Sequence, residues 1–130
     1  MNLEKVRELL DAAFASKKAD RPGGGDLEVR SCHASDLMSD VLTFRGPGSL
    51  LLTGLTNPQV IRTAEMADFA AIGFVRGKKP QPETIHLAEE KGVPLLVTPL
   101  PMFESCGRLY AKGLRGGDRE EETAGCRKKT

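Results

Sequence analysis

The amino-acid sequence predicts an α/β domain, a three-layer α/β/α sandwich built on a mostly parallel sheet of about four strands. Short apolar runs without alternation recur at residues 50–52, 70–75 and 95–97, as is typical of strands that are buried on both faces. Each run is followed by turn residues and then by a segment with helical periodicity. Strands separated by helices pair in parallel through right-handed crossovers, so these units predict one doubly covered sheet.

Residues 1–18 are predicted to form an amphipathic helix that Asn2 can cap. The apolar side chains recur three or four residues apart, at Leu3, Val6, Leu10 and Phe14. The simpler interpretation is a helix docked on the domain, and a helix that binds a partner is the alternative. The glycine- and proline-containing residues 19–26 are expected to be a linker.

The α/β domain is expected to span residues 27–114. Residues 27–33 alternate as in a strand, and Ser35 is predicted to cap a short helix over residues 36–44 that starts with Asp36. Asn57 is predicted to cap the helix that follows the second strand, with Pro58 as its first residue.

Two further helices carry clear end signals. Pro82 is predicted to start one helix and Gly92 to end it in the left-handed conformation, with Pro94 at the expected offset. A last helix is expected over residues 102–112, ended by Gly113. The charged residues 115–130 have no apolar period and are expected to form a disordered tail.

Composition excludes several classes of function. A net charge of +1, the absence of Trp and a single Tyr give no basic field and no aromatic platform, so no nucleic-acid partner is expected. No apolar run reaches the ~20 residues of a membrane span. Neither membrane binding nor a secretory signal is therefore expected, and the predicted location is cytoplasmic. The three cysteines form no CxxC motif, so no metal centre and no cofactor is expected.

Polar residues gather at the predicted carboxyl ends of the strands, where open parallel sheets bind ligands. Free N–H groups at helix starts and a basic turn would favour an anion there. Helix capping alone is the competing explanation for the hydroxyl and amide residues. The candidate ligand-binding residues are Ser35, Asp36, Thr53, Gly54, Thr56, Asn57, Arg76, Gly77, Lys78, Lys79 and Thr98.

No catalytic set is legible. The sequence contains no GxxxxGK[ST] loop, so P-loop kinase chemistry is excluded, and His33 lacks a recognisable nucleophile partner. Asp36 and Asp40 lie four residues apart and could hold Mg²⁺, although such pairs are common on solvated helices. Cys32 is either a reactive thiol at the site or, more simply, a small buried apolar residue.

Three separated segments resemble small stand-alone DRTGG-domain proteins. They are A-S-D-L-M-S-D-V at residues 34–41, the succession of elements over residues 75–99, and F-E-S-C-G-R-L-Y at residues 103–110. Residues 75–99 give a strand, a G-x-x-P turn, a helix with A-E-E-K-G-V-P and a strand that ends in Thr-Pro. The resemblance covers residues 26–114. It implies a fold like the N-terminal domain of HPr kinase/phosphorylase, without the catalytic domain.

The resemblance also implies a regulatory role, since DRTGG domains accompany CBS pairs and phosphotransacetylase-type enzymes. The leading hypothesis is a non-catalytic ligand-sensing module for a nucleotide or phosphorylated metabolite. The alternative is a protein-interaction adaptor, in homodimeric form, for a hydrogenase or iron–sulfur redox enzyme, beside which stand-alone members occur. The third is an enzyme using Ser35, Asp36 and His33.

Overall fold

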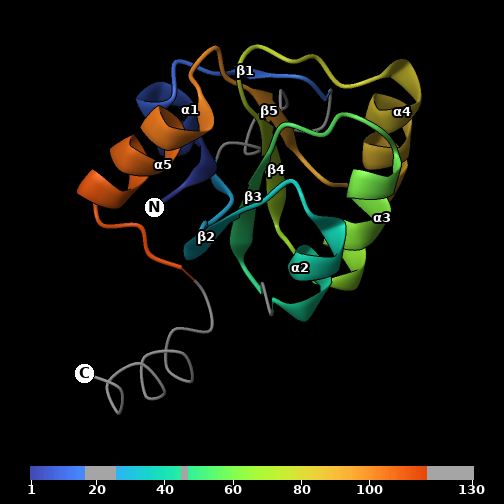
Figure 1. Cartoon of the computed structure of the whole chain (residues 1–130). Helices are drawn as coiled ribbons and strands as arrows, with labels where there is room; N and C mark the ends of the chain where they lie inside the picture. Colours follow the sequence, from blue (N-terminus) through green and yellow to red (C-terminus); the bar gives the residue numbers. More distant parts are fainter. Residues whose placement is uncertain (17–25, 45–46, 117–130) are drawn as a thin grey trace.

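The computed structural model describes residues 1–16, 26–44 and 47–116 (Figure 1). These residues form five helices and five strands. In chain order the elements are α1 (Leu3–Leu9), β1 (Ala13–Phe14), β2 (Ser31–Ala34), α2 (Met38–Thr43), β3 (Ser49–Thr53), α3 (Gln59–Met66), β4 (Ala71–Phe74), α4 (Pro82–Lys91), β5 (Leu95–Val97) and α5 (Met102–Ala111).

The strands form a single sheet in the order β1-β5-β4-β3-β2. Strands β2 to β5 pair in parallel, with Leu51 level with His33 on one side and with Ile72 on the other. Strand β1 pairs with β5 in the antiparallel sense. The α/β class and the mostly parallel sheet are confirmed, with one strand more than the four expected.

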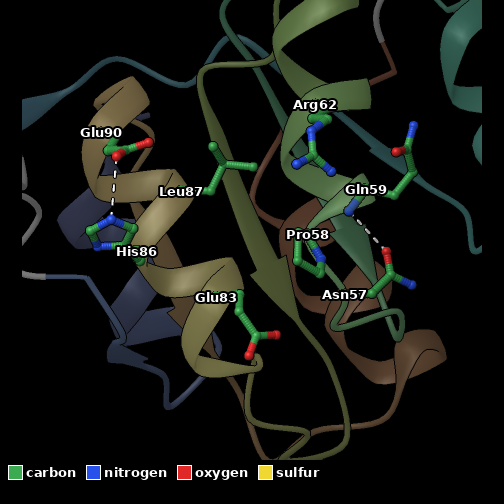
Figure 2. Close-up of a pocket in the computed structure, with 8 residues that line it drawn as sticks. All are labelled: Asn57, Pro58, Gln59, Arg62, Glu83, His86, Leu87 and Glu90. Carbon is green, nitrogen blue, oxygen red and sulfur yellow. Dashed lines mark hydrogen bonds and ion pairs between the residues drawn. The ribbon is translucent and has the colours of Figure 1, made fainter.

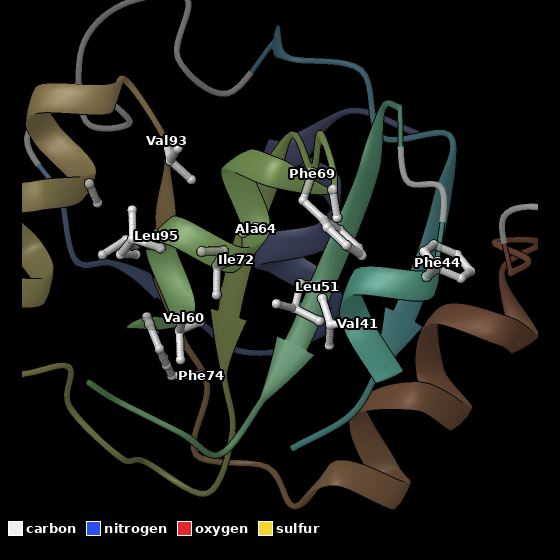
Figure 3. Packing of buried hydrophobic residues seen from close by; sticks show 13 residues of the cluster. Val41, Phe44, Leu51, Val60, Ala64, Phe69, Ile72, Phe74, Val93 and Leu95 are labelled. Carbon is white, nitrogen blue, oxygen red and sulfur yellow. The ribbon is translucent and has the colours of Figure 1, made fainter. Parts of the chain in front are cut away.

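Helices cover both faces of the sheet (Figure 1). Helices α2, α3 and α4 pack on one face around the first core cluster, which is shown in Figure 3. Helices α1 and α5 pack on the other face around the second core cluster. Successive strand residues point to opposite faces, so Leu51 belongs to the first cluster, and Leu50 and Leu52 belong to the second. All three side chains are fully buried, which confirms the three layers.

Helix α4 has the ends that the sequence predicts. Pro82 stands at its first position, where the missing N–H costs no hydrogen bond. Gly92 follows with a φ of 72°, and the N–H of Val93 donates to the carbonyl oxygen of Ala88 at 2.9 Å.

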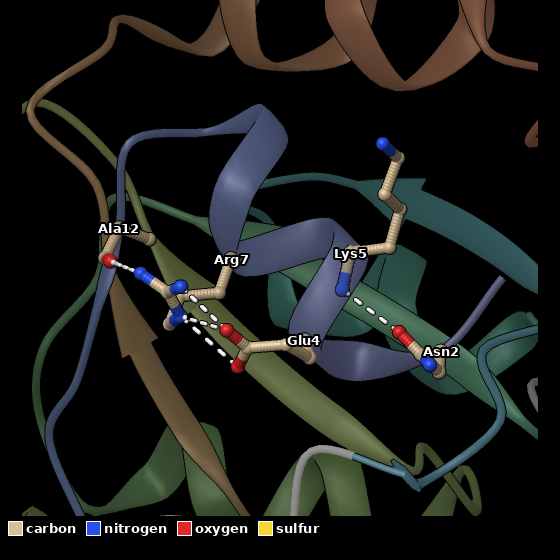
Figure 4. Close-up of polar contacts among 5 residues, drawn as sticks. All are labelled: Asn2, Glu4, Lys5, Arg7 and Ala12. Carbon is tan, nitrogen blue, oxygen red and sulfur yellow. Dashed lines mark hydrogen bonds and ion pairs between the residues drawn. The ribbon is translucent and has the colours of Figure 1, made fainter.

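Helix α1 ends at Leu9, far short of the predicted residue 18. Its N-cap is as expected, because the Oδ1 of Asn2 accepts the N–H of Lys5 at 2.8 Å. Arg7 pairs with Glu4 and also donates to the carbonyl oxygen of Ala12 (Figure 4). The docked interpretation is confirmed, since Leu3 and Val6 are fully buried.

The prediction that the helix continues through Phe14 is wrong. Asp11 has a φ of 52°, which turns the chain out of the helix, and Ala13 and Phe14 then pair with Val97 and Leu96. The edge of β5 offers backbone N–H and C=O groups that need partners, and this tertiary demand overrides the helical pattern.

Two other boundaries differ from those predicted. The first parallel strand begins at Ser31, because the segment before it lies against the N-terminus: the N–H of Leu3 donates to the carbonyl of Leu27, and that of Val29 to the carbonyl of Met1. Helix α2 begins at Met38, so Asp36 lies outside it.

The expected linker and tail lie mostly outside the described residues. Arg115 is described, and the prediction that it belongs to a detached tail is wrong. Its carbonyl oxygen accepts the N–H of Cys32 at 2.9 Å, and its guanidinium lies 3.9 Å from the centroid of the Tyr110 ring. Among the described helices, none is long and apolar enough to cross a membrane.

Candidate functional site

The structure divides the predicted site residues between two parts of the strand-end edge. Ser35, Asp36, Thr53 and Gly54 meet where β2 and β3 end, as the parallel register requires. Residues 76–79 and Thr98 meet where β4 and β5 end. Thr56 and Asn57 lie in the loop between β3 and α3.

The carboxylate of Asp36 occupies the first part of the edge. Its Oδ1 accepts the N–H of Gly54 at 2.6 Å and the hydroxyl of Thr53 at 3.0 Å. Both donors belong to residues that the sequence predicts to bind an anionic ligand. Because a negative side chain already satisfies them, this part of the edge disfavours an anionic ligand.

Three further predicted residues hold the backbone in place. The hydroxyl oxygen of Ser35 accepts the N–H of Leu37 at 3.0 Å, and the Oδ1 of Asn57 accepts that of Gln59 at 3.0 Å. The carbonyl oxygen of Thr56 accepts the hydroxyl of Thr84 at 2.7 Å. Helix α3 begins at Gln59 and Pro58 before it already has helical angles, so local capping accounts for Asn57. The prediction that Ser35 caps a helix is wrong, because α2 begins at Met38, after Leu37, and has no side-chain cap hydrogen bond.

The turn at residues 76–79 is fixed at its start and exposed at its end. Arg76 and Gly77 have φ values of 59° and 67°, in the left-handed region. Their N–H groups donate to the carbonyls of Leu100 at 2.8 Å and of Thr98 at 2.7 Å. Lys78 and Lys79 are exposed, so the turn presents cations on a rigid base. The hydroxyl of Thr98 is buried and donates to the carbonyl of Leu10.

A cleft of about 480 Å³ opens beside this turn. We call it the strand-end cleft. It is bounded by the β1 edge, by the end of β5 and by the first turns of α4. Its lining residues are Asp11, Ala13, Phe14, Ala15, Gly77, Lys79, Pro80, Ile85, Val97 and Pro99.

The strand-end cleft joins an apolar wall to a cation. Phe14, Ile85 and Val97 supply the apolar surface of the cleft. Lys79, from the basic turn, supplies the cation. The carboxylate of Asp11 also faces the cleft, but it lies 3.4 Å from a guanidinium nitrogen of Arg108, which offsets its charge. An apolar space with few polar groups is the usual character of a small-molecule site.

A second groove, of about 540 Å³, runs between α3 and α4 (Figure 2). It contains Asn57 and Arg62, but Glu83 and Glu90 also line it, and Glu90 pairs with His86 at 3.2 Å. The two carboxylates oppose an anion here. We therefore place the candidate ligand site in the strand-end cleft.

The candidate catalytic and metal-binding residues make contacts that explain them as structural residues. The ring of His33 stacks on Phe44 with centroids 4.1 Å apart, and its Nε2 lies 3.3 Å from Asp40. Asp36 is engaged elsewhere, so Asp36 and Asp40 do not share a helical face as predicted. Within the described ranges, no three metal-ligating side chains come together.

The thiol of Cys32 packs against the second core cluster. Burial raises the pKa of this thiol to about 12, and the neighbouring Cys106 adds to the effect. The thiolate, which is the reactive form, is therefore disfavoured at neutral pH. Cys32 is half-buried, and its packing against the second core cluster fits the simpler interpretation of a small apolar residue.

The sequence missed the whole β1 side of the strand-end cleft. Ala13, Phe14 and Ala15 were expected on a helix, and their alternation is too short to signal a strand. Val97 is the last residue of the predicted strand and Pro99 lies two residues after it, so their place at the edge could have been found from the topology.

The fold is similar to that of a known regulatory region. The match is to a crystal structure of the CBS and DRTGG domains of the regulatory region of a pyrophosphatase from Clostridium perfringens, complexed with its activator diadenosine tetraphosphate. The TM-score is 0.61 at 17% sequence identity, and the match covers 83% of this chain and 45% of that chain. At this identity the likeness shows the fold. The chain thus spans less than half of that structure, and neither a family model nor a curated protein matches its sequence.

Proposed function

We propose that this domain is a non-catalytic ligand-sensing module that binds a nucleotide or a similar phosphorylated molecule in the strand-end cleft. The observation that carries the proposal is the joining of an apolar wall to an exposed basic turn in one cleft of about 480 Å³. That volume suits a small ligand, since such sites span roughly 300–1,000 Å³. A flat apolar ring would lie against Phe14, Ile85 and Val97, and a phosphate would meet Lys78 and Lys79.

The similar regulatory region supports the class of ligand, because it is complexed with a nucleotide activator. The likeness to HPr kinase and the redox-enzyme adaptor stay predictions from the resemblance, and the cytoplasmic location stays a prediction from the sequence. No charge pattern or contact among the described residues favours the adaptor over a ligand site.

The test is an NMR titration of the whole chain with AMP, pyrophosphate and sulfate. We expect the amides of Gly77, Lys79 and Ala15 to shift, and AMP to bind more tightly than pyrophosphate because only AMP contacts the apolar wall. The amide of Gly54 should stay in place, since it already donates to Asp36. Rising salt should weaken binding, because the lysines are exposed.

Charge variants identify the site. Lys78→Ala combined with Lys79→Ala should weaken AMP binding about tenfold, a typical loss for two charge-assisted contacts. The matched control, Lys5→Ala combined with Lys91→Ala, removes two exposed lysines elsewhere and should leave affinity unchanged. Flat shifts in millimolar AMP, or shifts centred on Gly54, would contradict the proposal.

A further inference from the structure

The groove between α3 and α4 is separate from the strand-end cleft (Figure 2). We call it the α3–α4 groove. It measures about 540 Å³, and none of its lining residues also lines the strand-end cleft. Pro58 on the α3 side and Leu87 on the α4 side give it apolar walls. A function of this groove can therefore be tested independently of the function proposed above.

Contacts between the two helices bound the α3–α4 groove at both ends. At one end the hydroxyl of Thr84 donates to the carbonyl oxygen of Thr56 at 2.7 Å, and the N–H of Gln81 donates to the same oxygen at 3.2 Å. At the other end the ammonium group of Lys91 lies 3.5 Å from the carboxylate of Glu65. These contacts hold the starts and the ends of α3 and α4 together, so the groove between them has a fixed length.

Two opposite charges in the groove are available to a ligand. Glu90 pairs with His86 at 3.2 Å, which leaves the carboxylate of Glu83 and the guanidinium of Arg62. Neither of these two groups makes a hydrogen bond or an ion pair with any residue that the structure describes. The groove therefore presents one unpaired anion from α4 and one unpaired cation from α3.

The two unpaired charges lie at different levels along the groove. Figure 2 shows the guanidinium of Arg62 at the level of Leu87, and the carboxylate of Glu83 nearer the start of α4. Glu83 and Leu87 are one turn of α4 apart, which is about 6 Å along the helix axis. Charge-assisted hydrogen bonds are about 2.8 Å long, so a small ligand whose own charges are close together reaches both groups at once.

We propose that the α3–α4 groove binds a small zwitterion of the amino-acid type, with its carboxylate on Arg62 and its ammonium group on Glu83. A guanidinium holds a carboxylate through two parallel hydrogen bonds. An apolar side chain of the ligand would lie against Leu87 and Pro58. Glu83 repels a simple anion and Arg62 repels a simple cation, so the groove favours a ligand that carries both charges.

An NMR titration of the whole chain with L-leucine and two analogues tests the proposal. Isoamylamine lacks the carboxylate and isocaproate lacks the amino group, so each analogue pairs with only one of the two charges. We expect L-leucine to bind at least about tenfold more tightly than either analogue. The amides of Gln59 and Leu87 should shift, and the amide of Gly77 in the strand-end cleft should stay in place. An analogue that binds as tightly as L-leucine overturns the proposal, as does the absence of shifts at millimolar L-leucine.

Neutral variants identify the two charges. Arg62→Gln and Glu83→Gln should each weaken the binding of L-leucine about tenfold, because each leaves one end of the zwitterion without its partner. The matched control combines Lys5→Gln with Glu8→Gln. It removes one exposed cation and one exposed anion from α1, on the other face of the sheet, and should leave the affinity unchanged. Wild-type affinity in either groove variant would contradict the proposed site.

Exchanging the two charges separates pairing with a zwitterion from a structural effect. Arg62→Glu alone should abolish binding of L-leucine, since both sides of the groove would then carry a carboxylate. Arg62→Glu combined with Glu83→Arg should recover most of the loss, because a zwitterion can bind in the reversed direction. Thermal melts establish that each variant is folded. A folded double variant that binds no better than Arg62→Glu alone overturns the proposed pairing.

Discussion

Gly73 lies in the middle of β4, where a side chain would have to share space with the sheet's second core cluster. A Cβ built on Gly73 would come within 2.9 Å of the Cδ2 of Leu52. Leu52 is fully buried, so its side chain has little room to move away. Glycine is therefore required at position 73 by packing against Leu52, and not by an unusual backbone conformation.

Gly73→Ala should destabilise the protein by about 1–3 kcal/mol, the usual cost of forcing an extra carbon into a packed core. Urea unfolding measures this change. The same substitution at Gly107, where the space is open, is the control and should have the opposite sign. A neutral Gly73→Ala would show that Leu52 can change rotamer freely.

The thiol of Cys32 links stability to pH in the alkaline range. The unfolded chain releases this proton near the ordinary pKa of 9.0, whereas the folded chain keeps it until a pKa of about 12. Between those values the folded state binds more protons, so the contribution to stability is complete below pH 9 and is lost as pH rises towards 12.

Wild type should therefore lose about 1 kcal/mol more stability than Cys32→Ala between pH 8 and pH 10. Urea unfolding of both proteins at the two pH values gives the difference, in which the other titrating groups cancel. Parallel losses in the two proteins would mean that the Cys32 thiol ionises in the folded state as easily as in the unfolded one.

At the scale of elements, the domain continues beyond the last residue of the apolar pattern. Arg115 follows the last buried apolar residue, Leu114, yet it pairs with Cys32 through the backbone and covers Tyr110. An apolar pattern cannot reveal a backbone hydrogen bond or a cation lying on a ring. The predicted boundary at residue 114 therefore leaves out a residue that contacts the domain.

Two truncations test this boundary. A chain ending at Gly116 should keep the melting midpoint of the full protein, because residues 117–130 have no apolar period in the sequence. A chain ending at Leu114 should melt several degrees lower, since it loses the hydrogen bond to Cys32 and leaves that N–H without its partner. Equal midpoints would show that Arg115 contributes nothing.

At the scale of the whole molecule, covering both sheet faces makes neighbouring residues of β3 equally important. Leu51 packs into the first core cluster and Leu50 into the second, and both are fully buried. In a sheet with one solvated face, only one of two neighbouring positions would matter.

Leu50→Ala and Leu51→Ala should each destabilise the protein by about 2–5 kcal/mol, the range for a buried leucine truncation. Thermal or urea unfolding measures both. Leu42→Ala is the control and should cost much less, since Leu42 is 48% exposed on α2. A near-neutral result for Leu50→Ala alone would mean that α1 and α5 cover their face only loosely.

Much of the fold was determined by the sequence alone. Continuous apolar runs predicted the three central strands, because a strand that is buried on both faces has apolar side chains at successive positions. Proline and glycine marked the ends of α4, because the backbone conformations that they favour are local properties. The parallel direction of β2 to β5 followed from the helices between them, and with it the edge of the sheet at which a ligand would bind.

Tertiary structure alone decided β1 and the composition of the site. Residues 13–14 have a helical pattern, but they pair with the edge of β5, whose backbone groups need partners. The hydrophobic pattern of residues 13–14 does not reveal that partner strand. Tertiary structure also decided the role of Asp36, which the sequence predicts at a helix start beside an anion site. The fold brings its carboxylate to the N–H of Gly54, 18 residues away, and so fills one part of the edge and leaves the cleft beside the basic turn as the place for a ligand.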